Sequence, residues 1–172
     1  ACWLLPISQP PVEDGWIGVA DGPLRRVGSG PPPMSSRRLG NVAVLPGLVN
    51  AHTHLELSWM AGMIPPAASM EEWISRMLQL RRLGPPGGLE GLQRAAWEAA
   101  RGMRATGTVL VGDISNTLQA VGALREADLG GVVFHEILGF NVVDAAQFVR
   151  DAWDRVAAVP GPVRKGGAPL AM

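Results

Sequence analysis

The sequence of 172 residues has little of two residue types that carry much protein chemistry, with a single cysteine, Cys2, and only three histidines. One cysteine excludes an internal disulfide and any zinc site built from cysteines, and it is typical of a reducing compartment. The 15 basic and 15 acidic side chains cancel, so no net field draws the chain toward nucleic acid or an anionic membrane. No apolar run approaches the roughly 18 residues that cross a bilayer, and the first residues do not resemble a signal peptide. We therefore expect a soluble, cytoplasmic protein without nucleic-acid or membrane partners.

Residues 1–44 contain short apolar runs that turn-forming residues interrupt. Asp21 and Gly22 separate two strand-like runs and predict a hairpin. The segment from Gly28 to Pro33 contains two glycines and three prolines, which excludes a helix or a central strand. We predict a first domain over residues 1–44 that forms part of a small β-sandwich.

The chain from residue 45 alternates between apolar runs and amphipathic stretches. The helices are expected to begin after Ser69, near residue 89, after Asn116 and after Asp144. Ser69 and Glu72 form a capping box in which the carboxylate reaches back to the N–H of the cap. An apolar stripe follows on the first helix: Met70, Trp73, Ile74, Met77 and Leu78. Gly130 is expected to close the third helix.

Apolar runs typical of buried parallel strands lie between these helices. They cover residues 42–49, 108–111 and 132–138, and another run begins at residue 163. Strands that alternate with helices predict parallel βαβ units. We therefore expect an α/β fold over a second domain, residues 45–172.

His52 and His54 stand two residues apart at the end of an apolar run. Because side chains alternate along a strand, both imidazoles are expected on the same side, where they can hold one metal ion. An H-x-H pair taken alone also occurs by chance, and is then often two solvated side chains.

The run Leu45-Pro46-Gly47-Leu48-Val49-Asn50-Ala51-His52-Thr53-His54-Leu55-Glu56 resembles the first barrel strand of the amidohydrolase superfamily. The match is nearest to its deaminase and chlorohydrolase branch, which includes the aminofutalosine and adenosylhomocysteine deaminases. The resemblance implies a (β/α)8 barrel with a metal at the carboxyl ends of its strands. It makes His52 and His54 the first two metal ligands, with zinc expected and iron or manganese as alternatives. The implied reaction is hydrolysis of a C–N bond in a small-molecule ring amine by metal-activated water.

A complete barrel of this kind takes about 250 residues, whereas this chain supplies about three βα units. The ligands that the resemblance implies on later strands cannot be assigned, so we expect a truncated part of a longer protein. Three interpretations stay open: a metal-dependent hydrolase, a catalytically incomplete fragment that associates through exposed barrel edges, and a small non-catalytic α/β binding domain.

Three carboxylates are further candidates for contacts with the substrate or with the metal ligands: Glu56, Asp113 and Glu136. Each has a simpler alternative. Glu56 would be a solvated carboxylate at a strand end, Asp113 a cap of the next helix, and Glu136 one partner in a structural hydrogen bond. No catalytic residue is assigned. His135 is expected to pack between strand and helix. A cytidine-deaminase type of site is excluded, because it needs two further cysteines in P-C-x-x-C.

Overall fold

The structure is a computed structural model that describes residues 1–33, 35–139, 141–160 and 170–171. It divides into two compact units, Ala1–Gly47 and Leu48–Met172. The second unit begins at Leu48, whereas the sequence analysis places the domain boundary between residues 44 and 45. Each unit is described by itself.

The first unit consists of two small sheets. Strands β1 (Trp3–Leu4), β2 (Val12–Glu13) and β5 (Ala43–Val44) form one sheet in the order β2-β1-β5. Strands β3 (Gly15–Val19) and β4 (Leu24–Ser29) pair antiparallel. The turn between them contains Asp21 and Gly22, both at positive φ (55° and 99°), which confirms the predicted hairpin.

The second unit is built on a parallel sheet of four strands in the order β6-β7-β8-β9. Its strands are β6 (Leu48–Thr53), β7 (Thr108–Ser115), β8 (Gly130–His135) and β9 (Leu170–Ala171). The α/β class is confirmed, and strand order follows chain order, as consecutive βα units require. The run expected from residue 163 falls mostly on residues 161–169, which lie outside the described residues.

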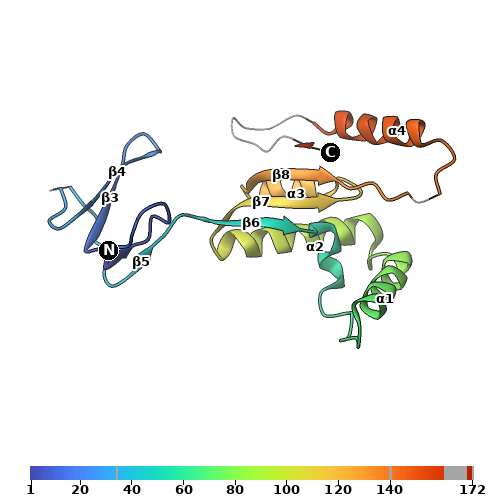
Figure 1. The fold of residues 1–172 in the computed structure, drawn as a ribbon, viewed down its shortest axis with the longest axis horizontal. Coiled ribbons are helices and arrows are strands. Elements are labelled where there is room, and N and C mark those ends of the chain that lie inside the picture. Colours follow the sequence, from blue (N-terminus) through green and yellow to red (C-terminus); the bar gives the residue numbers. More distant parts are fainter. Residues whose placement is uncertain (34, 140, 161–169, 172) are drawn as a thin grey trace. The chain divides into compact units, whose positions relative to one another are not determined.

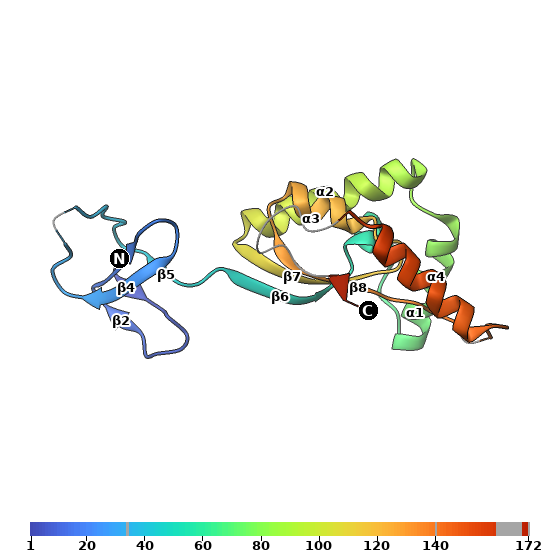
Figure 2. The same cartoon turned by 90° about the horizontal axis from the view of Figure 1, so that it is seen from above.

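Helices cover one face of this sheet. The helices are α1 (Met70–Leu83), α2 (Gly88–Ala105), α3 (Ala120–Glu126) and α4 (Ala145–Ala158), and a 3-10 helix, η1 (Leu55–Met60), follows β6. Figures 1 and 2 show β6, β7 and β8 running in one direction with α2 and α3 along one side. The core joins Val111 and Val133 of the sheet to Ala96 and Ala100 of α2 and to the apolar face of α3. The opposite face of the sheet is exposed at Val49, Leu110 and Phe134.

Two glycines allow the strands to pair closely. A Cβ on Gly112 would lie 2.3 Å from the carbonyl oxygen of Ala51 on β6, and one on Gly131 would lie 1.9 Å from that of Val111. Gly131 also has a φ of 151°, which side chains rarely adopt. Both positions therefore require glycine.

The predicted start of α1 is confirmed, with one difference. The Ser69 hydroxyl accepts the N–H of Glu72 at 3.2 Å, but the Glu72 carboxylate reaches the N–H of Ala68, at 3.0 Å, one residue before the cap. The expected apolar stripe is not buried, since Met70 is 69% exposed and Trp73 is 40% exposed. Asp144 caps α4 as expected, through the N–H of Gln147.

The prediction for the third helix is wrong at both ends. Gln119, not Asn116, is the N-cap of α3, and no side chain caps it. The helix ends at Glu126, and Gly130 is instead the first residue of β8. Asn116 does not cap because its side chain is engaged by other residues, described below. Within the described part of the chain, no helix combines the length and apolar character that a membrane span needs.

Candidate metal and active site

The two histidines lie together at the carboxyl end of β6. His52 is exposed in the strand, and His54 is half-buried just after it, at the start of η1. Their ring centroids are 5.2 Å apart and their planes make an angle of 70°. The rings are therefore neighbours, as the alternation of side chains along a strand predicts.

This spacing fits a shared metal ion. Two imidazoles bound to one tetrahedral zinc ion place their ring centroids about 5 Å apart, because each nitrogen lies about 2 Å from the ion and about 1 Å from its ring centre. Catalytic zinc sites use three protein ligands. Over the described ranges, no group of three or more His, Cys, Asp or Glu side chains could hold a metal ion. The pair fits two positions of such a site.

Glu56 is buried, with only 5% of its surface exposed, and binds the loop that follows β7. Its carboxylate accepts hydrogen bonds from the Ser115 and Thr117 hydroxyls. It also accepts the backbone N–H groups of Asn116 at 3.0 Å, Thr117 at 3.1 Å and Gln119 at 3.0 Å. Burial raises the pKa of Glu56, but the hydrogen bonds outweigh burial and lower it overall. The carboxylate therefore joins η1 to this loop and is not a solvated strand end.

Asp113 is fully buried in β7 and makes the reverse connection. Its Oδ1 accepts the N–H of Leu55 at 2.8 Å, whereas its Oδ2 has no hydrogen-bond partner within the described ranges of the chain. Burial raises the pKa of Asp113 to about 6; the hydrogen bond from Leu55 lowers it and the charge of Glu56 raises it by smaller amounts. Asp113 of β7 thus binds a backbone N–H in the segment after β6, and Glu56 after β6 binds backbone N–H groups in the loop after β7.

Asn116 links three elements at the same edge of the sheet, a role that the sequence did not indicate. Its Oδ1 accepts from the Arg81 guanidinium of α1 at 2.6 Å. Its Nδ2 donates to the carbonyl oxygen of Glu136 at 2.9 Å and to the Glu136 carboxylate at 3.1 Å. Three polar residues in a row, Ser115-Asn116-Thr117, stand at the end of the buried strand, and such a run indicates a loop that can carry functional side chains. Nothing in the sequence pointed to Arg81.

The remaining candidates lie on β8 and just after it. Glu136 is half-buried, and its carboxylate accepts a hydrogen bond from Asn116. This is the structural hydrogen bond that the sequence analysis gives as one alternative. His135 is buried, and its Nδ1 lies 3.1 Å from the carbonyl oxygen of Ser115. Nδ1 is therefore the donor to this carbonyl, and in the part of the chain that the structure describes the buried Nε2 has no hydrogen-bond partner. This agrees with a packed, hydrogen-bonded histidine.

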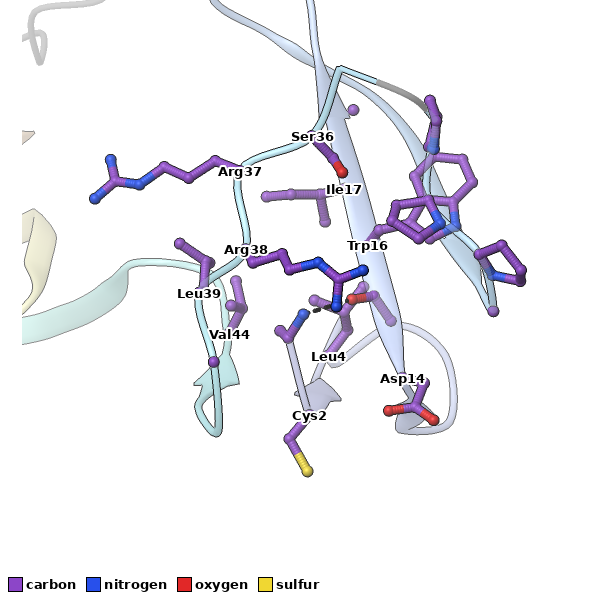
Figure 3. Close-up of a pocket in the computed structure, with 18 of the residues that line it drawn as sticks. Cys2, Leu4, Asp14, Trp16, Ile17, Ser36, Arg37, Arg38, Leu39 and Val44 are labelled. Carbon is purple, nitrogen blue, oxygen red and sulfur yellow. Dashed lines mark hydrogen bonds between the residues drawn. The ribbon is translucent and has the colours of Figure 1, made fainter.

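A cleft of about 960 Å³ lies elsewhere, in the first unit. Figure 3 shows Arg38 extending into it beside Ile17, while Arg37 points away. Its lining also includes Cys2, Asp14 and Trp16, but none of the predicted site residues. The predicted site residues lie instead at the carboxyl ends of the parallel strands, the end of the sheet at which ligands bind in α/β folds.

Two curated proteins are similar in sequence. A 5-methylthioadenosine/S-adenosylhomocysteine deaminase of Nitratidesulfovibrio vulgaris is 38% identical over 71 residues, which are 38% of this chain and 16% of that protein. An adenosine deaminase of Helicobacter pylori is 34% identical over 110 residues, which are 63% of this chain and 25% of that protein. The chain thus spans a quarter or less of the curated relatives that it matches. No family model matches it.

Two solved structures share the fold. An aminofutalosine deaminase of Helicobacter pylori, in complex with methylthio-coformycin, superposes with a TM-score of 0.77 at 24% identity. The superposition covers 99% of this chain and 41% of that one. An amidohydrolase of Brucella melitensis superposes with a TM-score of 0.61 at 16% identity, over 99% of this chain and 44% of that one. The chain is thus similar in sequence to two proteins named as deaminases, and in fold to an aminofutalosine deaminase and an amidohydrolase, over a stretch that makes up less than half of each relative.

Proposed function

We propose that this chain forms part of a hydrolase that deaminates an adenine-like ring amine, with His52 and His54 as two ligands of a divalent metal. Zinc is the first choice, and iron or manganese are alternatives, because imidazole suits several metals. The observation that supports this most directly is the pair of rings 5.2 Å apart at the carboxyl end of β6. The sequence similarity to proteins named as adenosine and methylthioadenosine deaminases supports the substrate class.

The reaction replaces an amino group by oxygen. A divalent metal held by these imidazoles would supply an activated water, because coordination to the metal lowers the pKa of the water to about 7. The C–O bond forms at the ring carbon while one proton of the water passes to the ring nitrogen and the other to the amino group, and the C–N bond then breaks so that ammonia leaves. In this scheme His52 and His54 hold the metal through ring nitrogens, while Asp113 and Glu56 fix the backbone that follows His54. We place the protein in the cytoplasm, since its one cysteine suits a reducing compartment.

A second candidate is metal binding without turnover by this chain on its own. It is favoured by the lack, among the described residues, of a third side chain close enough to complete the site. Two ligands are too few for a catalytic zinc centre. Under this proposal the chain binds zinc weakly and releases no ammonia from adenosine.

Zinc titration of the full chain tests both candidates. We expect wild type to bind one zinc ion, and the H52A/H54A double variant to lose affinity by more than about tenfold. H135Q changes the third histidine and serves as the matched control, with folding followed by circular dichroism. Equal zinc affinity of wild type and the double variant would remove the metal site. Chelator-sensitive ammonia release from adenosine by the chain alone would remove the second candidate.

A further inference from the structure

One residue of β7 holds the backbone on both sides of His54. The register of the sheet pairs Asp113 with Thr53, the residue before His54. The Oδ1 atom of Asp113 accepts the N–H of Leu55, the residue after His54, at 2.8 Å. His54 itself lies just after the strand and is the N-cap of η1, with φ −129° and ψ 79°. The backbone at His54 is therefore held from β7 at both neighbouring residues.

Packing alone does not explain an aspartate at this position. Asp113 is 0% exposed, and among the residues that the structure describes its Oδ2 has no hydrogen-bond partner. A buried carboxylate with an unpaired oxygen costs free energy, and an apolar side chain of similar volume would avoid that cost. The carboxylate supplies an acceptor for the N–H of Leu55. Neither β6 nor η1 offers one, because the first N–H groups of a helix have no partner within the helix.

The contact acts at the place where the two rings must stay together. β6 ends at Thr53, and its pairing with β7 is irregular between Asn50 and Thr53, so strand pairing does not fix His54. The two imidazoles nevertheless stand 5.2 Å apart. Holding Leu55 sets the direction in which the chain leaves the strand, and with it the direction of the His54 side chain.

We propose that Asp113 is a positioning residue for His54, which keeps the His54 ring beside His52 by holding the N–H of Leu55. The consequence for metal affinity rests on the proposed function, in which both histidines bind one ion. The consequence for the arrangement of the two rings does not depend on the proposed function, because it concerns the chain without metal.

Three variants of the full chain separate the acceptor from the charge and from the volume. D113N keeps an oxygen that can accept the N–H of Leu55. D113L fills a similar volume without an acceptor, and D113A removes both. D154A changes an exposed aspartate of α4 and is the matched control. Circular dichroism establishes which variants fold.

The first readout is NMR of the metal-free chain. We expect ring-to-ring NOEs between His52 and His54, and a slowly exchanging amide at Leu55, in wild type, D113N and D154A. Both signals should be lost in D113L. A folded D113L that keeps the NOEs and the protected amide would overturn the proposal, as would their loss in D113N.

The second readout is titration with Zn²⁺ and with Co²⁺, whose absorption spectrum reports ligand geometry. We expect D113L and D113A to weaken binding by about tenfold or more, and D113N to stay within about threefold of wild type. If H52A/H54A binds as wild type does, the proposed metal site fails, and the NMR experiment alone decides on Asp113. If binding depends on the histidines but is unchanged in folded D113L, the positioning role fails and the metal site stands.

Discussion

Glu56 and Thr117 are 61 residues apart in the chain and are joined by both the backbone N–H and the hydroxyl of Thr117. The N–H lies 3.1 Å from each carboxylate oxygen, and the hydroxyl lies 2.7 Å from Oε1. The contact joins the segment after β6 to the loop after β7, beside the histidine pair. It makes Glu56 a structural residue of the candidate site whether or not it also approaches a substrate.

Replacing Glu56 should therefore cost stability. In E56A the buried N–H and hydroxyl groups around position 56 lose a charged acceptor, and we expect the free energy of unfolding to fall by about 3 kcal/mol. E98A removes an exposed glutamate from α2 and should stay within about 0.5 kcal/mol of wild type. Urea unfolding at pH 7 measures both. A loss as small in E56A as in E98A would contradict the anchoring role.

Asp113 should give the stability of the chain a distinctive pH dependence. Its pKa is raised to about 6 in the folded chain, against 3.8 for a free aspartate. The unfolded chain loses this proton first, so stability from this group is present below about pH 4 and is lost as the pH rises through about 6. A shift of about two pKa units corresponds to about 3 kcal/mol.

D113N is the variant that isolates this group, because it cannot ionise and keeps an acceptor for Leu55. We expect urea unfolding between pH 4 and 7 to show a smaller decrease in stability for D113N than for wild type. Glu56 acts in the opposite direction, since its lowered pKa stabilises the fold above its unfolded pKa and that contribution is lost as the pH falls. Identical pH profiles for D113N and wild type would contradict the assignment.

Local signals predicted the elements well, and contacts between distant residues account for what the sequence missed. Ser69 and Asp144 cap their helices because capping depends on residues three positions away. Asn116 carries the same capping signal, yet it binds Arg81 and Glu136 instead. Those partners lie 35 and 20 residues away, beyond the reach of any local pattern.

The candidate site shows the same division. The spacing of His52 and His54 predicted neighbouring rings, because alternation along a strand is a local property. Glu56 is buried and binds five groups at the end of β7 and in the loop after it, and these contacts depend on the pairing of β6 with β7. The sequence also could not predict that the apolar stripe of α1 is exposed, because an amphipathic pattern does not show whether another element packs against the apolar face.

Gly131 tests the close approach of β7 and β8. In G131A the new Cβ would meet the carbonyl oxygen of Val111 at 1.9 Å, at a φ that alanine disfavours. We expect a loss of about 2–4 kcal/mol. Gly122 of α3 has nothing within 4 Å of an added Cβ, so G122A should gain about 0.5–1 kcal/mol from helix propensity. A thermal unfolding midpoint of G131A that equals that of wild type would show that the strands can move apart at no cost.

The exposed face of the parallel sheet should cause the chain to associate. Parallel sheets are normally covered on both faces, whereas here Val49 is 62%, Leu110 46% and Phe134 39% exposed. β6 is also an end strand of its sheet, and unpaired N–H and C=O groups on such an edge favour pairing with another chain. We expect light scattering after gel filtration to give a mass that rises with concentration above 18.2 kDa.

Two substitutions identify the surface responsible for this association. L110T/F134T makes the exposed face polar and keeps residues that favour strands, so it should shift the population toward the mass of one chain. V143T makes the same kind of change at an exposed valine outside the helices and strands, and should leave the distribution as in wild type. If both variants associate as wild type does, the sheet face is not the contact, and the exposed stripe of α1 becomes the next surface to change. A wild-type chain of constant 18.2 kDa at every concentration would show that the face tolerates water.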